Sequence, residues 1–186
     1  MMGRNVKIDS AADVVEFLKS QHEEIKGLFT QVTATTGEQR KQNFADLRRL
    51  LAVHETAEEE IVHPRAKSEL DDGNAVVAAR LEEEREAKEV LAELEKLDVD
   101  SPEFEEMFSS FRHDVIAHAE AEEMEEFSKL SAELDEKQLH RMRKAAELAE
   151  KTAPTHPHSG VESRAANLAA GPFAAMMDRA KDLISS

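Results

Sequence analysis

Three histidines and three glutamates could do chemistry in this sequence, because each interrupts an apolar helix stripe. His54 and Glu58 are four residues apart, as are His118 and Glu122, so each pair would share one face of a helix. Burying such groups is costly unless a partner or a metal ion holds them. The pattern therefore predicts one shared metal site inside a bundle of helices. The candidate ligands are His22, His54, Glu58, Glu84, His118 and Glu122.

The charge of these side chains favours two metal ions over one. With neutral histidines, the three carboxylates contribute three negative charges. Two Fe²⁺ ions, or two Fe³⁺ ions with an oxo bridge, contribute four positive charges, so either pair is nearly neutralised, as a buried site requires. A single Zn²⁺ ion would leave negative charge in excess. Carboxylates and imidazoles together suit iron, so the ligand set predicts a dinuclear centre.

Four amphipathic helices must position these ligands, and the apolar spacing predicts them over residues 10–33, 38–67, 75–97 and 102–134. Short connections would make them antiparallel neighbours in up-down-up-down order. At a rise of about 1.5 Å per residue, the six candidate ligands fall within about one helical turn of a common level. Pro64 is expected to end or kink the second helix early. The predicted fold is all-α, an antiparallel four-helix bundle with a C-terminal helical extension.

The bundle is expected to occupy residues 10–134 and the extension residues 135–186. Within the extension, residues 136–151 favour a helix, and TAPTHPHSG is a linker rich in proline and histidine. Residues 161–184 form an amphipathic helix in this interpretation. Its apolar stripe, which includes Phe173, Met176 and Met177, is read as a core or docking face whose partner the sequence does not name.

Composition excludes several functional classes. The 186 residues contain 24 Lys and Arg against 40 Asp and Glu, a net charge of −16, which argues against nucleic acid and anionic membranes as partners. Without cysteine there is no thiolate zinc site or iron–sulfur cluster, and without tyrosine there is no tyrosyl ligand. No apolar leader or membrane-length apolar stretch is found, so we expect a cytoplasmic protein.

The remaining histidines are not predicted to bind metal. His63 lies half a turn from His54 on an α-helix and is expected at the surface of the helix end. His113 lies off the apolar stripe, so it is expected beside the ligands or in solvent. Solvation is expected for the others, His140, His156 and His158.

Three segments resemble the hemerythrin-like family, which has an HHE cation-binding domain. They are FLKSQHEEI around His22, AVHETAEEE with His54 and Glu58, and IAHAEAEE with His118 and Glu122, within residues 10–134. The resemblance implies that the three histidines are terminal ligands and that the two glutamates bridge the metals. It also implies a cofactor of two iron ions in an oxo- or hydroxo-bridged centre.

Glu84 departs from the family pattern. Family members usually have histidine here, in a context like LEEHRE, where this sequence reads LEEEREAK. That departure argues against reversible oxygen carriage, because a third carboxylate stabilises Fe³⁺ and resembles the ligand balance of di-iron enzymes.

The predicted function is therefore a non-haem di-iron oxidoreductase that decomposes hydrogen peroxide as a catalase does. It needs no catalytic residue apart from the metal ligands and no further cofactor-binding residue. Two alternatives stay open. One is binding, sensing or scavenging of dioxygen or nitric oxide at the same centre, and the other is a helical scaffold with an empty site.

Overall fold

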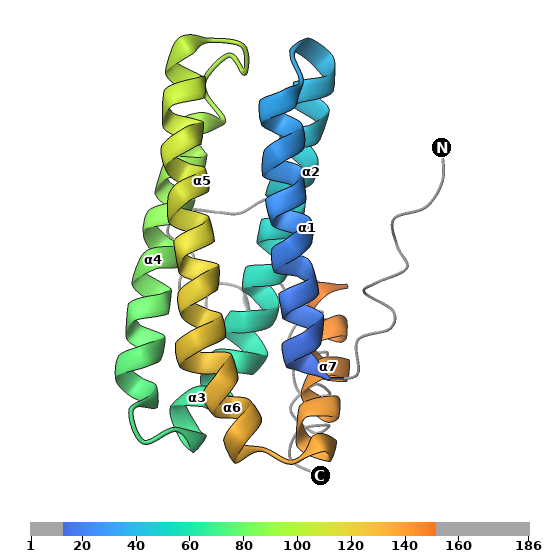
Figure 1. Ribbon diagram of the computed structural model, residues 1–186, viewed down its shortest axis with the longest axis vertical. Coiled ribbons are helices and arrows are strands. Elements are labelled where there is room, and N and C mark those ends of the chain that lie inside the picture. The colour runs from blue at the N-terminus through green and yellow to red at the C-terminus, as the bar shows by residue number, and fades with distance from the viewer. Residues whose placement is uncertain (1–12, 152–186) are drawn as a thin grey trace, which may run out of the picture.

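The computed structural model describes residues 13–151, all of them in helices or the short turns between helices (Figure 1). Four long helical runs stand side by side as the bundle, and a fifth helix packs against one end of the first two. The elements are α1 (Val14–Ala34), α2 (Gly37–Ala57), η2 (Glu58–Val62), α3 (His63–Glu69), α4 (Gly73–Leu94), α5 (Pro102–Glu122), η3 (Glu123–Phe127), α6 (Ser128–Glu133) and α7 (Glu136–Glu150).

This architecture confirms the predicted all-α bundle with an additional C-terminal helix. The predicted linker and the amphipathic helix at residues 161–184 lie outside the described residues. No helix among residues 13–151 is long and apolar enough to cross a lipid bilayer.

Helix starts follow from local sequence. The Asp13 side chain accepts a hydrogen bond from the Glu16 N–H at 3.0 Å and so caps α1. Ser101 caps α5 in the same way, with Pro102 at the first helical position. Asp135 begins α7 in a reciprocal capping box with Gln138. Each cap satisfies N–H groups that a helix start leaves without partners.

Two of the four long runs contain a π-helical turn, which the sequence analysis did not predict. The turn η2 begins at Glu58, and η3 begins directly after Glu122. A π-turn holds one residue more than an α-turn, so it rotates everything that follows by about 100° around the helix axis. Pro64 does not end the second run, because it lies in the first turn of α3, which continues to Glu69.

Two apolar cores fill the bundle, one on each side of the candidate ligands. One core is rich in phenylalanine and contains Phe29, Phe44, Phe104, Phe108 and Phe111. The other contains mainly aliphatic residues and joins α7 to the bundle through Leu139, Met142, Ala145, Ala146 and Ala149. Along each long run the candidate ligands fall between residues of the two cores. Packed apolar layers therefore hold the polar level of the bundle from both sides.

Candidate metal centre

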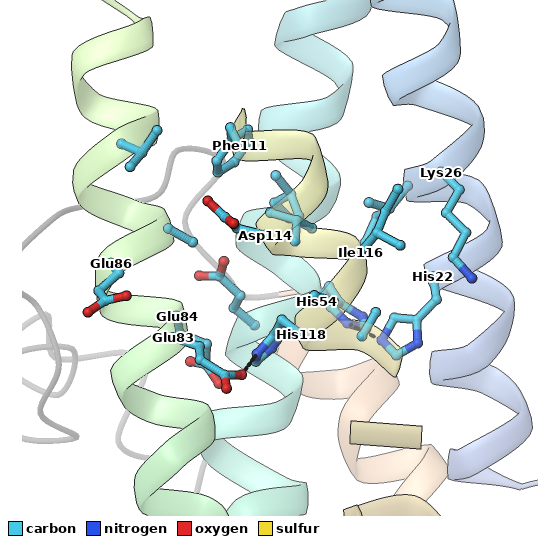
Figure 2. Close-up of a pocket in the computed structure, with 18 residues that line it drawn as sticks. His22, Lys26, His54, Glu83, Glu84, Glu86, Phe111, Asp114, Ile116 and His118 are labelled. Atoms are coloured by element: carbon cyan, nitrogen blue, oxygen red, sulfur yellow. Dashed lines mark hydrogen bonds and ion pairs between the residues drawn. The ribbon is translucent and has the colours of Figure 1, made fainter. Parts of the chain in front are cut away.

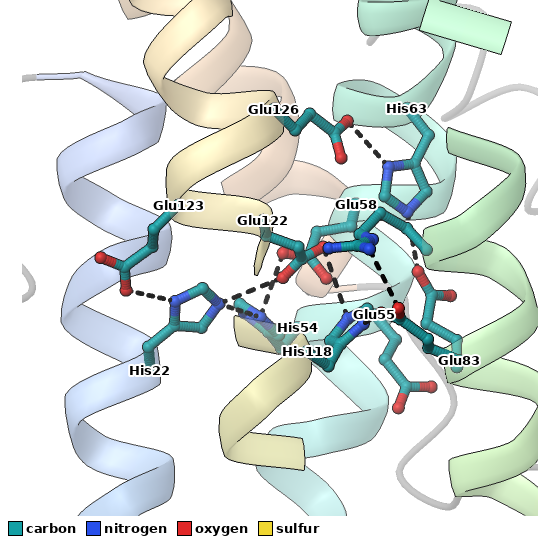
Figure 3. Close-up of polar contacts among 12 residues, drawn as sticks. His22, His54, Glu55, Glu58, His63, Glu83, His118, Glu122, Glu123 and Glu126 are labelled. Atoms are coloured by element: carbon teal, nitrogen blue, oxygen red, sulfur yellow. Dashed lines mark hydrogen bonds and ion pairs between the residues drawn. The ribbon is translucent and has the colours of Figure 1, made fainter. Parts of the chain in front are cut away.

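The six predicted ligands meet in two overlapping groups. His22, His54, Glu58 and Glu122 form the first group, and Glu58, Glu84, His118 and Glu122 form the second. Within each group, one ligand atom per residue lies within 4.8 Å of every other. Figure 3 shows the imidazoles converging on Glu58 and Glu122, the two residues that both groups share. If two metal ions were bound, Glu58 and Glu122 would each be within reach of both.

The ligand atoms are spaced as neighbours around one ion would be. His22 Nε2 lies 3.1 Å from His54 Nε2 and 3.4 Å from Glu122 Oε2. His54 Nε2 lies 3.1 Å from Glu58 Oε1, and His118 Nε2 lies 3.4 Å from Glu122 Oε1. Ligands held at bonds of about 2.0–2.2 Å lie roughly 3 Å from one another. These separations therefore fit a metal ion in each group.

Five of the six oxygens of Glu58, Glu84 and Glu122 lack a hydrogen-bond partner in the protein. Both oxygens of Glu58 and of Glu122 are enclosed and accept no hydrogen bond, and neither does Oε2 of Glu84. Buried carboxylate oxygens normally accept hydrogen bonds, so several unpartnered oxygens at one place indicate that a binding partner belongs there. A pair of cations would satisfy all of them, which makes the residues present a good fit for two metal ions.

Each predicted histidine ligand is oriented in the same way. Its Nδ1 faces an oxygen of a neighbouring side chain, and its Nε2 faces the carboxylates at the centre. The Nδ1 partners are Glu123 for His22 at 2.9 Å, Gln21 for His54 at 2.7 Å and Glu83 for His118 at 2.7 Å. Because these partners accept, Nδ1 carries a proton and Nε2 is the atom available to a metal. These three acceptors were not predicted from the sequence.

The prediction for His63 was wrong. Its side chain is 2% exposed, with Nε2 at 2.7 Å from Glu84 Oε1 and Nδ1 at 2.9 Å from Glu126 Oε1. The turn η2 rotates His63 inward, whereas an unbroken α-helix would have pointed it to solvent. Likewise Glu126, which lies within η3, is buried in the interior.

Of the other histidines, His113 is exposed and lies outside both ligand groups. His140 is exposed, as expected. His156 and His158 lie outside the described residues.

Burial and charge distribute protons unevenly over the site. Burial raises the pKa of Glu58 to about 7, and the neighbouring Glu84 carboxylate adds to the rise. Burial also raises the pKa of Glu122. For Glu84 burial acts in the same direction, but His63 and Lys88 outweigh it and lower the pKa to about 2. Glu84 is therefore a carboxylate at neutral pH, while Glu58 is protonated in part of the metal-free molecules.

The imidazoles also differ in their protonation. Burial lowers the pKa of His54 to about 3, and the nearby His22 contributes to this lowering. Burial also acts to lower the pKa of His118, but Glu122, Glu83 and Glu58 together outweigh it and raise the pKa to about 9. The metal-free protein therefore holds a neutral His54 and a protonated His118, and a metal ion would have to displace the second proton.

A buried lysine borders the second ligand group. Lys88 Nζ contacts Glu59, and it lies 3.4 Å from Glu55 Oε2 and 3.7 Å from Glu84 Oε2. Burial raises the pKa of Glu55 to about 8, against the opposing charge of Lys88. This cluster supplies one fixed positive charge close to an otherwise acidic ligand set.

A cavity of about 330 Å³ opens beside the site between α1, α2, α4 and α5. Apolar side chains such as Leu51, Val90 and Phe111 form much of its wall. Figure 2 shows that His22, His54, Glu84 and His118 lie at one end of this cavity. A small molecule entering here would reach both ligand groups.

A sequence model of the hemerythrin HHE cation-binding domain matches residues 13–130. The fold resembles the crystal structure of a hemerythrin HHE cation-binding domain-containing protein from Mycobacterium kansasii, a homologue of Rv2633c. The TM-score is 0.62 at 24% identity, and the match covers 90% of this chain and 98% of that one. At this identity the likeness shows the fold alone.

A DNA nickase from Nostoc sp. (strain PCC 7120) is 24% identical over 127 residues. The match covers 68% of this chain and 36% of the nickase, so the chain spans about a third of that relative's length.

Proposed function

Because this chain belongs to the hemerythrin HHE cation-binding domain family, we propose that its two ligand groups hold two iron ions and that the centre decomposes hydrogen peroxide. One observation carries this proposal. Glu58 and Glu122 belong to both groups, and all four of their oxygens are buried without a hydrogen bond. Two carboxylates in that position can hold two cations side by side.

The iron ions would supply the redox chemistry, in which one peroxide is reduced to two waters and a second is oxidised to dioxygen. The protein's own residues hold and tune the pair. Glu84 adds a negative charge to the second group, which favours the more highly charged oxidation state. The small, largely apolar cavity favours an uncharged substrate of a few atoms, and hydrogen peroxide fits that description.

The test uses the full-length protein loaded with iron and no reductant. We expect it to release dioxygen from hydrogen peroxide over many turnovers, measured with an oxygen electrode. Glu122→Ala should lose both iron and turnover, while Glu120→Ala, an exposed glutamate on the same helix, should keep both. Absence of sustained oxygen release from a protein with two irons would overturn the catalase proposal.

Sensing or scavenging of dioxygen or nitric oxide is the second candidate function. It is favoured by a hydrogen-bond chain from the additional helix to the site. Glu150 on α7 accepts from Gln21 Nε2 at 2.6 Å, and Gln21 Oε1 accepts from His54 Nδ1 at 2.7 Å. A ligand that shifts His54 would therefore disturb the hydrogen bond that Gln21 makes to Glu150 on α7.

Removal of residues 153–186 separates these two functions. A catalase should keep its iron and most of its peroxide turnover, because every candidate ligand precedes residue 153. A sensor should bind nitric oxide stoichiometrically and lose its ligand-dependent output.

The nicking activity of the Nostoc relative is not proposed for this chain. A net charge of −16 opposes binding to the phosphate backbone of DNA. We expect no nicking of supercoiled plasmid by the iron-loaded protein, checked by gel mobility. A helical scaffold with an empty site, the third alternative, would be supported if the purified protein contained no metal.

A further inference from the structure

We propose that His63 is a seventh protein ligand of the centre, binding through Nε2 on the side of Glu84 and His118, and that Glu126 orients it. This inference rests on the proposed dinuclear centre. It adds to the six predicted ligands a residue that lies outside both His-x-x-x-Glu pairs.

Position supports this assignment. His63 is 2% exposed, and its Nε2 lies 2.7 Å from Oε1 of Glu84, a member of the second ligand group. One nitrogen of His63 and one oxygen each of Glu122 and Glu126 lie within 4.8 Å of one another. His63 therefore touches the second group directly and approaches a residue that both groups share.

Orientation supports it independently. In the three predicted histidine ligands, Nδ1 faces a side-chain oxygen and Nε2 faces the centre. His63 follows the same rule, because its Nδ1 lies 2.9 Å from Glu126 Oε1 and its Nε2 faces Glu84. A carboxylate on the far nitrogen of an imidazole is the usual support of a metal-bound histidine. Figure 3 shows this for two of the rings, with His22 facing Glu123 and His63 facing Glu126.

A π-helical turn brings each of these two residues to the interior. His63 follows η2 directly, and Glu126 lies within η3. Without the extra residue of each π-turn, both side chains would be rotated away from the interior by about 100°. π-turns are rare and occur frequently at functional sites. Two of them, each beginning at or just after a shared carboxylate, place one imidazole and its supporting carboxylate together.

The competing explanation is a purely structural ion pair, in which His63 is a cation held between Glu84 and Glu126. The two explanations predict opposite signs. If His63 is a ligand, replacing it weakens metal binding. If it is a cation that neutralises Glu84, a metal must compete with it, and replacing it strengthens metal binding.

The experiment titrates metal-free, full-length protein with Co²⁺ and with Fe²⁺ under anaerobic conditions, in the wild type, His63→Gln and His113→Gln. The last is a matched control, because His113 is exposed and outside both ligand groups. We expect His63→Gln to weaken the binding of one of the two ions by about 10- to 100-fold, the range by which metal affinity falls when support of a metal site is lost. His113→Gln should bind both ions like the wild type. Unchanged or tighter binding by His63→Gln would overturn the inference.

A second measurement does not depend on how the variant folds. Imidazole N–H protons of histidines bound to Co²⁺ give exchangeable, paramagnetically shifted proton resonances. Four are expected in the wild type, from His22, His54, His63 and His118, and three would overturn the inference. Glu126→Gln should keep four and displace one of them, and an unmoved set would remove the orienting role of Glu126.

These outcomes distinguish the role of His63 from the existence of the dinuclear centre. Wild-type protein that binds two ions but shows three resonances contradicts only the role of His63. Wild-type protein that binds fewer than two ions contradicts the proposed dinuclear centre, and the assignment of His63 falls with it.

Discussion

The two halves of the candidate centre share their carboxylates but differ in their other ligands. The first half contributes His22 on α1 and His54 on α2, and the ring of Phe127 stacks on that of His22 with 5.7 Å between the ring centroids. The second half contributes His118 and the anionic Glu84, with Lys88 beside them. The side chain of His118 is 15% exposed, against 1% for His22 and 5% for His54.

Two ions bound in these halves would therefore not be equivalent. The second half offers one more negative charge, which stabilises the ion with the higher charge. It is also the more open half, so an incoming molecule reaches it more readily. Apart from the shared carboxylates, the first half contributes only imidazoles, and hydrogen bonds to Glu123 and Gln21 orient them.

The largest effect is expected from removing a shared carboxylate, because it belongs to both halves. Glu58→Ala and Glu122→Ala should each lose iron, measured as metal per chain, together with metal-dependent stabilisation. Metal at about 100 times its Kd stabilises a folded protein by about 2.7 kcal/mol, and this gain should disappear from the melting curve. Full iron content in both variants would show that these carboxylates are not ligands. Glu120→Ala serves as the unaffected control.

Making the halves alike should have the next largest effect. Glu84→His removes a negative charge from the second half, so we expect metal to be retained and the reduction potential to rise. A charge about 4 Å away at an effective dielectric constant of about 20 implies a change on the order of 100 mV. A redox titration followed by absorbance measures it, and peroxide turnover should change as well. If spectrum, potential and turnover are all unchanged, Glu84 is not a ligand.

The stability of the metal-free protein should depend on pH differently from that of the metal-loaded protein. His118 has its pKa raised to about 9, and Glu55 has its pKa raised to about 8, so the folded state binds more protons than the unfolded state. The metal-free protein should therefore lose stability as pH rises from about 6.5 to about 9. A loss on the order of 1–3 kcal/mol would lower Tm by several degrees.

Metal should reverse this trend, because ligands must lose their protons to bind it. Melting curves at the two pH values, with and without a chelator, give the comparison. His118→Gln should flatten the dependence of the metal-free protein. A metal-free protein that became more stable over this pH range would contradict the proton assignment.

The smallest effect is expected in the supports of the first half. Gln21→Leu removes the acceptor of His54 Nδ1 and should weaken the binding of one metal ion by about tenfold. Glu150→Ala removes only the next partner in the chain and should cost less than that. Lys144→Ala, an exposed residue on the same helix, is the control. Competition with a chromophoric chelator measures each affinity, and a loss confined to the second ion would contradict the division into halves.

Helix periodicity was enough to predict the bundle and to bring six side chains to one level. It works because an α-helix turns by a constant angle, so residues four apart stay on one face. His63 and Glu126 escaped prediction because the π-turns break that constancy, and no local propensity marks where an extra residue enters. Gln21 and Glu83 escaped for another reason. Their roles depend on how neighbouring helices are rotated against each other, which one helix does not encode.

Helix α7 makes the working unit longer than the part recognised by sequence. The family match ends at residue 130, yet the hydrogen-bond chain from His54 ends at Glu150, and α7 fills part of the aliphatic core. A protein cut after residue 134 would keep every candidate metal ligand while leaving Gln21 without its carboxylate and an apolar face open to water. The family match therefore covers the candidate metal ligands, whereas the residues that support His54 extend to the last turn of α7.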